Sequence, residues 1–168
     1  MNDFHWRDEY LFDIHSKVEQ HGFTIQYVFG EGLDPSWGYT IGLLAYGHPE
    51  VIVFGLDSQS TAQALHWLFD EITAGISRPV GRETEQALGA PALPVRLLPV
   101  PDAHWDCIED RLCIAVEYYD ALGWDRSKLR ALQLVWATPS GHFPWQSECS
   151  DRFRRLQPLL DPGARRAA

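Results

Sequence analysis

The sequence lacks the features typical of exported and membrane proteins. Its three cysteines, Cys107, Cys113 and Cys149, are an odd number without close paired spacing, which argues against a disulfide framework and fits a reducing compartment. The longest apolar run, Val51 to Leu56, is far shorter than the roughly 20 residues that a membrane span needs. The first residues are acidic where an export signal would be basic. We therefore expect a cytoplasmic protein without a membrane partner.

Positive charge is also scarce. Only 14 Lys and Arg stand against 23 Asp and Glu, which gives a formal net charge of −9. Such a chain repels phosphate backbones, so nucleic acid is not an expected partner, whereas a basic protein is a reasonable one. Five arginines near the end can form a local positive patch, although short terminal runs of charge are usually just solvated: Arg152, Arg154, Arg155, Arg165 and Arg166.

Motifs for cofactors and metals are missing as well. The chain has no Walker-type phosphate loop, no G-x-G-x-x-G fingerprint and no G-x-S-x-G elbow, so we predict no cofactor. His104 and Cys107 are three residues apart, but no second close pair accompanies them. We therefore predict no metal site.

What the chain does contain is enough apolar material for one core. It has 168 residues, of which 45% are hydrophobic and 12% aromatic. We expect a single domain over residues 1–168, with a core of about 8–146 and a peripheral C-terminal segment, 147–168, that ends in a frayed tail. No pattern indicates the oligomeric state.

The hydrophobic spacing predicts an α+β fold. Three- and four-residue spacing predicts helices, and alternating or wholly apolar runs predict strands. The expected class is a single layer of mainly antiparallel sheet, with about five strands, covered by two to three amphipathic helices. The predicted helices are 8–21, 57–75 with a capping box from Ser60 to Gln63, and 102–122. The predicted strands are 23–29, 37–44 and 51–56 in a meander, 94–100 at an edge after a long loop, and 129–138.

The hairpin Trp37 to Leu56 carries two glycines in its first strand, Gly38 and Gly42. Because a strand glycine has no side chain to pack, it often marks a place where something approaches the backbone closely. That neighbour is either a ligand or a packed side chain, and the packing explanation is the more common one.

The turn of this hairpin contains His48 and Glu50 on either side of Pro49. In an extended backbone, residues two apart point to the same side, so the two side chains can act as an acid–base pair. The simpler alternative is that Glu50 only holds the turn in place.

Polar and aromatic residues elsewhere complete the set of candidates. Thr40 and Gln133 lie inside apolar strands, and each needs a hydrogen-bond partner if it is buried. Trp136, His142 and Trp145 gather around a Pro-Gly turn, a composition that suits either a hydrophobic lid or the rim of a binding site.

Several of these segments occur together in one known family. The residues Tyr39-Thr40-Ile41-Gly42-Leu43, Gly47-His48-Pro49-Glu50, Leu132-Gln133-Leu134-Val135-Trp136 and Phe143-Pro144-Trp145 follow in this order. In this respect the chain resembles the bacterial family known as domain of unknown function 4262, typically a free-standing intracellular domain. The resemblance covers about Gly22 to Trp145 and supports the element order, but it implies no particular activity. It suggests that the matching polar and aromatic residues form one shared feature.

Three functions fit these observations. The first is a module that binds a small ligand or a partner segment in a cleft beside the Trp37–Leu56 hairpin, with Gly38, Thr40, Gly42, Gln133, Trp136, His142 and Trp145 as candidate contacts. The second is a cofactor-independent acid–base enzyme in which His48 is the general base or acid and Glu50 orients it. The third is an acidic immunity or interaction protein.

Overall fold

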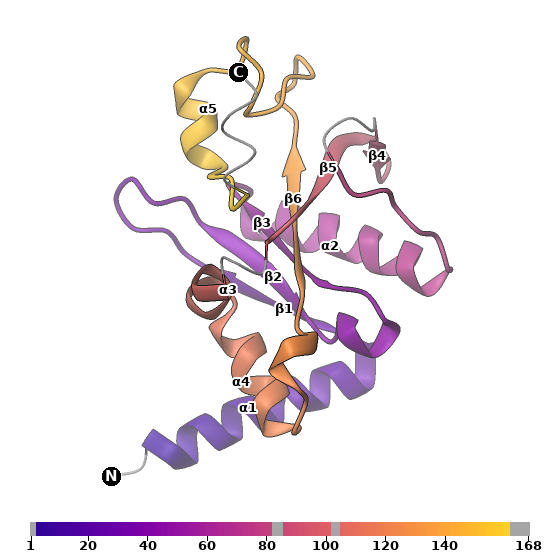
Figure 1. The fold of residues 1–168 in the computed structure, drawn as a ribbon, viewed down its shortest axis with the longest axis vertical. Coiled ribbons are helices and arrows are strands. Elements are labelled where there is room, and N and C mark those ends of the chain that lie inside the picture. The colour runs from indigo at the N-terminus through magenta and orange to yellow at the C-terminus, as the bar shows by residue number, and fades with distance from the viewer. Residues whose placement is uncertain (1–2, 82–85, 102–104, 162–168) are drawn as a thin grey trace.

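The computed structural model describes residues 3–81, 86–101 and 105–161, which form a six-stranded mixed sheet with helices on both faces (Figure 1). The strands are β1 (Thr24–Val28), β2 (Trp37–Ile41), β3 (Glu50–Phe54), β4 (Gln86–Leu88), β5 (Leu93–Pro99) and β6 (Ala131–Trp136). The helices are α1 (Asp3–His21), α2 (Ser58–Thr73), α3 (Trp105–Arg111), α4 (Cys113–Ala121) and α5 (Asp151–Leu156). The predicted α+β class is confirmed, with six strands rather than about five.

The strand order across the sheet is β1-β2-β3-β6-β5-β4. The first three strands form the predicted antiparallel meander, and β5 is antiparallel to both β4 and β6. The one parallel pair is β3 with β6, so the last strand enters the middle of the sheet rather than an edge. Apart from Glu50 and Gln133, the two central strands, β3 and β6, are apolar, as strands covered on two faces usually are.

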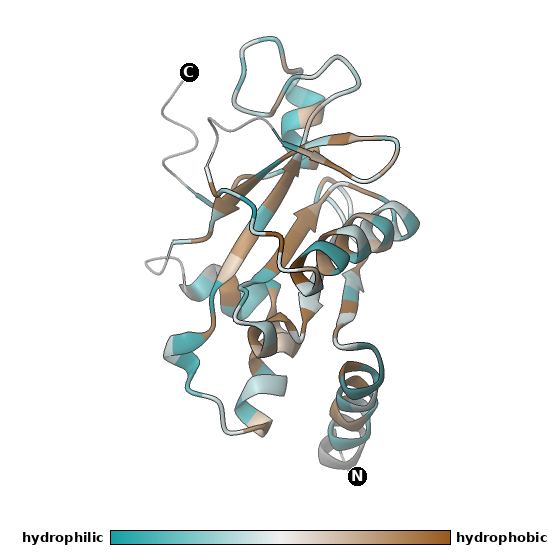
Figure 2. Cartoon of the chain, turned by 90° about the vertical axis from the view of Figure 1, so that its right-hand side faces the viewer, coloured by the Kyte–Doolittle hydropathy of each residue, from teal (hydrophilic) through white to brown (hydrophobic). Residues whose placement is uncertain are grey.

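Helices cover the two faces of the sheet unequally. Helices α1, α3 and α4 pack on one face, and α2 packs on the other. In Figure 2 the hydrophobic colour gathers on the strands and on the helix surfaces turned toward them. In helix α2 the apolar residues that bury this contact recur at three- and four-residue spacing: Ala64, Leu65 and Leu68. No helix within the described ranges has both the length and the apolar character that a bilayer crossing requires.

The end of β2 differs from the prediction. Gly42 has a φ of 121°, a backbone angle that residues with a side chain rarely adopt, so the strand ends at Ile41 and not at residue 44. A short 3-10 helix, η1 (Leu43–Tyr46), follows it. Strand β3 then begins at Glu50, one residue earlier than predicted. Glu50 is therefore the first residue of a buried strand rather than part of an exposed turn.

Three further boundaries are corrected by the structure. The predicted loop 76–94 contains β4, which pairs with β5, so β5 is not an edge strand; residues 82–85 of that loop lie outside the described ranges. The helix expected from Asp102 to Leu122 is divided into α3 and α4 at Leu112, and Asp102 itself is not described. Both helices face one core, which explains why their spacing resembles that of a single helix.

The start of helix α2 also differs from the prediction. Helix α2 is capped by Asp57, whose side chain accepts from the Ser60 N–H, rather than by Ser60.

Candidate functional site

Glu50 is the only Asp, Glu, Lys or Arg that is buried among the described side chains, with 0% of its surface exposed. Its carboxylate accepts hydrogen bonds from the hydroxyl groups of Thr40, at 2.5 Å, and Tyr119. It also accepts from the backbone N–H groups of Gly42 at 3.0 Å and Leu43 at 2.9 Å, with a longer contact to that of Leu44 at 3.4 Å. These donors tie β3 to the end of β2, to η1 and to α4.

The two hydroxyl groups around Glu50 are themselves satisfied. The Thr40 oxygen accepts from the Val51 N–H at 2.9 Å, and the Tyr119 oxygen accepts from the Gly42 N–H at 2.9 Å. Thr40 therefore has the hydrogen-bond partner that a buried hydroxyl needs. These two hydroxyl groups therefore link the carboxylate to backbone N–H groups of β3 and of the segment after β2.

The environment of Glu50 moves its titration toward neutral pH. Burial raises the pKa of the Glu50 carboxyl from 4.5 to about 7, because desolvation disfavours the charged form more than the hydrogen bonds from Thr40, Tyr119 and the backbone favour it. The carboxyl can therefore hold or release a proton in the physiological range. It has no exposed surface at which a substrate would meet that proton.

His48 lies at the same end of the hairpin but is not a partner of Glu50 in the described structure. Its Nδ1 atom is 2.7 Å from the Pro49 carbonyl oxygen, and the ring is half-buried. Burial lowers the pKa of this histidine, so its neutral form is favoured. The structure thus does not bring the predicted acid–base pair together through a hydrogen bond, and the catalytic role of both residues stays a prediction.

The two strand glycines lie against packed protein. A Cβ atom added to Gly38 would come within 2.4 Å of Cγ2 of Thr61 on helix α2. One added to Gly42 would come within 2.9 Å of the Gly22 carbonyl oxygen and 3.0 Å of the Phe23 Cα. Both glycines therefore allow close approach of a neighbouring element, as the packing explanation expected.

We expect the substitution Gly38→Ala to lower the free energy of unfolding by about 2 kcal/mol, because the new methyl group overlaps Thr61. The double variant Gly38→Ala/Thr61→Ser removes the overlapping Cγ2 atom and should recover at least about half of that loss. Urea denaturation of the wild type, both single variants and the double variant measures the coupling. A Gly38→Ala protein as stable as the wild type would show that the space beside the strand is open.

Two glutamine side chains attach the C-terminal segment to β6. Gln157, which is 1% exposed, accepts from the Trp136 N–H at 3.0 Å and donates to the Trp136 carbonyl at 2.8 Å. Gln133, predicted as a buried polar residue, donates to the Pro158 carbonyl at 2.8 Å and accepts from the Leu160 N–H at 2.9 Å. The segment predicted as peripheral is therefore bound to the centre of the sheet as far as its described residues extend.

We expect Gln157→Ala to loosen this segment, since it removes both hydrogen bonds to the Trp136 backbone. The free energy of unfolding should fall by about 2 kcal/mol. Amide hydrogen exchange should become faster in residues 151–161 and stay unchanged in β1 and α1. Gln59→Ala, on the exposed side of α2, is the control and should alter neither quantity. Equal acceleration throughout the chain would contradict a local role.

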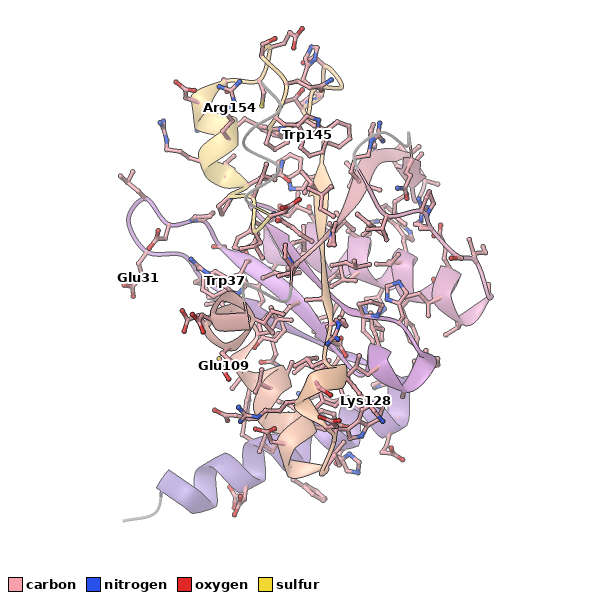
Figure 3. The ribbon with its side chains drawn as sticks, viewed as in Figure 1. Glu31, Trp37, Glu109, Lys128, Trp145 and Arg154 are labelled. Carbon is pink, nitrogen blue, oxygen red and sulfur yellow. The ribbon has the colours of Figure 1, made fainter. Side chains whose placement is uncertain are left out.

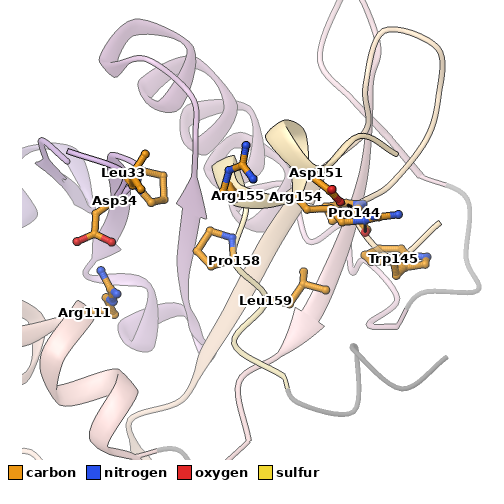
Figure 4. A pocket seen from close by; sticks show the side chains of 11 residues that line it. Leu33, Asp34, Arg111, Pro144, Trp145, Asp151, Arg154, Arg155, Pro158 and Leu159 are labelled. Atoms are coloured by element: carbon orange, nitrogen blue, oxygen red, sulfur yellow. Dashed lines mark hydrogen bonds and ion pairs between the residues drawn. The ribbon is translucent and has the colours of Figure 1, made fainter. Parts of the chain in front are cut away.

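A pocket of about 710 Å³ lies beside this segment and next to the loop that precedes β2 (Figure 4). It is bounded by the loop before β2, the end of α3 and the C-terminal segment. Figure 3 shows that Trp145 and Arg154 lie near the end of the sheet toward which β6 points. The lining residues are Leu33, Asp34, Pro35, Arg111, Pro144, Trp145, Asp151, Arg154, Arg155, Pro158 and Leu159.

The pocket combines charge with apolar surface. Three arginines and two aspartates line it, together with one aromatic ring and a group of proline and leucine side chains. Arg154 is held by Asp151 at 3.0 Å and by the carbonyl oxygens of Pro144 and Gln146. The volume lies within the range of about 300–1,000 Å³ that is usual for small-molecule sites.

A family model described as domain of unknown function, DUF4262, matches residues 17–150. The chain belongs to the DUF4262 family. This confirms the resemblance found in the sequence. Comparison with curated proteins and with solved structures gives no match. The part that matches the DUF4262 model includes Glu50 and Trp145 but ends before α5, so Arg154 and Arg155 lie beyond it.

The residues that carry the DUF4262 resemblance do not form one site. Thr40, Gly42 and Glu50 belong to the buried network, whereas Trp145 lines the pocket at the other end of the sheet. Trp136 supports the pocket wall indirectly: its indole N–H donates to the Phe54 carbonyl at 2.9 Å, and its ring packs on Phe153.

Of the candidate ligand contacts, Trp145 alone lines the pocket. His142 lies on the turn before it, where its backbone N–H donates to the Thr138 hydroxyl at 3.0 Å. The roles of the other candidates in ligand binding stay predictions.

For the other residues of the buried network and of the pocket, the signals in the sequence were incomplete. Arg154 and Arg155 were noted as part of a terminal basic cluster, but solvation was the simpler interpretation. Tyr119 lies within the predicted helix 102–122, and nothing in its local pattern indicated a carboxylate partner. Arg111 had no signal, because its position depends on packing between α3 and β2.

In the described part of this DUF4262 chain, no group of three or more His, Cys, Asp or Glu side chains is placed to hold a metal ion. The described cysteine side chains are those of Cys113, which is exposed, and Cys149, which is buried, and both are free thiols.

Proposed function

We propose that this protein is a binding module whose small-molecule ligand occupies the pocket between the loop 33–35, Arg111 and the C-terminal segment 144–159. The observation that carries the proposal is the pocket itself: about 710 Å³, lined by polar groups from separate elements and by apolar side chains. A few convergent polar groups in a largely apolar cavity are the usual composition of a ligand site. The pocket lies next to the loop that precedes the Trp37–Leu56 hairpin, and of the predicted ligand contacts Trp145 lines it.

The position of the pocket relative to the sheet supports the same function. Strands β3 and β6 are parallel, and their carboxyl ends, Phe54 and Trp136, lie toward the C-terminal segment that forms the pocket wall. In open sheets with parallel strands, ligands commonly bind beyond the carboxyl ends of those strands. Hydrogen bonds of Gln133 and Gln157 attach the C-terminal segment to β6, so this wall of the pocket is ordered before a ligand binds.

The alternative functions have less support. An acid–base enzyme of the predicted kind would need Glu50 to orient His48, yet the Glu50 carboxylate is fully buried and the His48 Nδ1 atom contacts the Pro49 carbonyl oxygen instead. An acidic interaction protein rests on the net charge of −9 alone. We further propose a cytoplasmic location, which the free thiols of Cys113 and Cys149 suit.

The proposal is tested by mapping a chemically diverse fragment library onto the protein with ¹H–¹⁵N correlation spectra. Bound fragments should shift the resonances of residues 33–35, 111 and 144–159. Leu159→Trp, which adds bulk inside the pocket, should abolish these shifts, while Leu122→Trp, at an exposed leucine outside the pocket, should retain them. Thermal unfolding confirms that both variants are folded. Fragments that shift only other regions would refute the proposal.

A further inference from the structure

We infer that the ligand of this pocket carries an acidic head group, a carboxylate or a phosphate, joined to a flat apolar body. The inference rests on the proposed function, because it requires that the pocket binds a small molecule. It adds the chemical class of that molecule. Two features of the pocket lead to it: guanidinium groups that the described protein leaves without a carboxylate partner, and an apolar wall that holds a fixed aromatic ring.

The guanidinium groups are those of Arg111 and Arg155, which come from α3 and α5 (Figure 4). Among the described residues neither forms an ion pair, in contrast to Arg154, which is paired with Asp151. Arg155 is exposed at the pocket. A guanidinium offers its N–H groups in a fixed plane that matches a carboxylate or a phosphate, so each of these side chains is suited to bind such an anion.

Packing fixes Arg111 in place. Its Cζ atom lies 4.7 Å from the centre of the Trp37 ring and 5.8 Å from that of Phe54. The Trp37 indole N–H also donates to the Arg111 backbone carbonyl at 3.0 Å. Because stacking on an aromatic face uses the plane of the guanidinium and not its N–H edge, the hydrogen-bonding edge remains usable.

The apolar wall lies in the same pocket and consists of Pro144, Trp145, Pro158 and Leu159. The Trp145 ring stacks on Phe143 with a centroid distance of 4.9 Å and an interplanar angle of 8°. Arg96 in turn lies over the Phe143 ring, 4.6 Å from its centroid. A ring held in this way offers an ordered surface for the apolar part of a ligand.

The charge balance of the pocket argues against a cationic ligand. The charged lining residues are three arginines and two aspartates, and one of the aspartates, Asp151, is paired with Arg154. Asp34 alone would have to attract a cation against the remaining two guanidinium groups. The rest of the chain is strongly acidic, so these arginines act at short range and select the ligand inside the pocket.

The test uses probes that separate the head group from the body. Phenylacetate and phenyl phosphate carry both parts, 2-phenylethanol carries the body without charge, and acetate and inorganic phosphate carry the head alone. Each is titrated into ¹⁵N-labelled wild type, Arg155→Gln and Arg152→Gln. Arg152 is the matched control, because it is an exposed arginine on the same helix that does not line the pocket.

We expect phenylacetate or phenyl phosphate to bind the wild type and shift residues 33–35, 111 and 144–159, and the tighter of the two identifies the head group. Arg155→Gln should raise the Kd of that probe at least about tenfold, the loss expected for one hydrogen bond to a charged group. Arg152→Gln should change it by less than about twofold, a change typical of a solvated surface charge. Binding of 2-phenylethanol should be weaker and indifferent to either variant.

The other outcomes separate the two proposals. If 2-phenylethanol binds the pocket as tightly as the acids and Arg155→Gln has no effect, the ligand class is wrong while the pocket remains a binding site. If acetate or inorganic phosphate binds as tightly as the phenyl compounds, the apolar body is refuted. If neither these probes nor the fragment library shifts the pocket resonances, the proposed function fails and the inference fails with it.

Discussion

Replacing Glu50 by alanine is expected to lower the free energy of unfolding by about 4 kcal/mol. The substitution removes the acceptor for Thr40, Tyr119 and the N–H groups that follow β2, all inside the protein. Each buried donor left without a partner costs about 1–3 kcal/mol, and the lost side chain also leaves a cavity. Urea denaturation at pH 6 measures the loss, and the yield of folded protein measures it when the variant is too unstable to purify.

Two comparisons make this prediction specific. Glu50→Gln keeps an acceptor oxygen and nearly the same volume, so it should cost only about 1 kcal/mol at pH 6. Glu31→Ala removes a glutamate side chain from an exposed loop and should change stability by less than about 0.5 kcal/mol. Should Glu50→Ala prove as stable as Glu31→Ala, the carboxylate would not hold β2, η1 and α4 together.

The stability of the wild type should fall as pH rises through neutrality because of Glu50. Its pKa is about 7 in the folded protein against 4.5 for an ordinary glutamate, so the folded state binds this proton more tightly than the unfolded state does. The contribution of Glu50 is therefore fully present below about pH 4.5 and is lost as pH rises through about 7. The total loss is about 3 kcal/mol by linkage.

The variant Glu50→Gln isolates this effect, since a glutamine does not titrate. Relative to the wild type, it should gain about 3 kcal/mol between pH 4.5 and pH 8. His48, whose pKa is lowered by burial, contributes in the opposite sense, and that contribution cancels in the difference between the two proteins. A difference that does not depend on pH would show that the five hydrogen bonds fully compensate the burial of the charge.

Much of the fold follows from local pattern. The meander of β1, β2 and β3 was predicted because alternating and wholly apolar runs are separated by short glycine-containing connections. Helix α2 was predicted because its apolar residues recur on one face. Strand β4 was missed, since three residues are too few to show a period, and α5 was missed because it has no apolar stripe.

The candidate site was predicted less completely. The hairpin drew attention to Glu50, and the aromatic turn drew attention to Trp145, which lines the pocket. The residues that complete each place are distant in sequence: Tyr119 is 69 residues from Glu50, and Arg111, on helix α3, lines the same pocket as Trp145. Periodicity indicates the face on which a residue lies, but not which distant element covers that face.

The sequence by itself determined the α+β class, the Trp37–Leu56 hairpin and the apolar faces of its main helices and strands, because these depend on neighbours along the chain. Only the tertiary structure decided that β6 lies between β3 and β5, parallel to β3, and that Glu50 is enclosed rather than exposed. It also decided that arginines of α3 and α5 line one pocket. These features depend on which elements pack together, and that choice is set by the burial of the whole core rather than by any single segment.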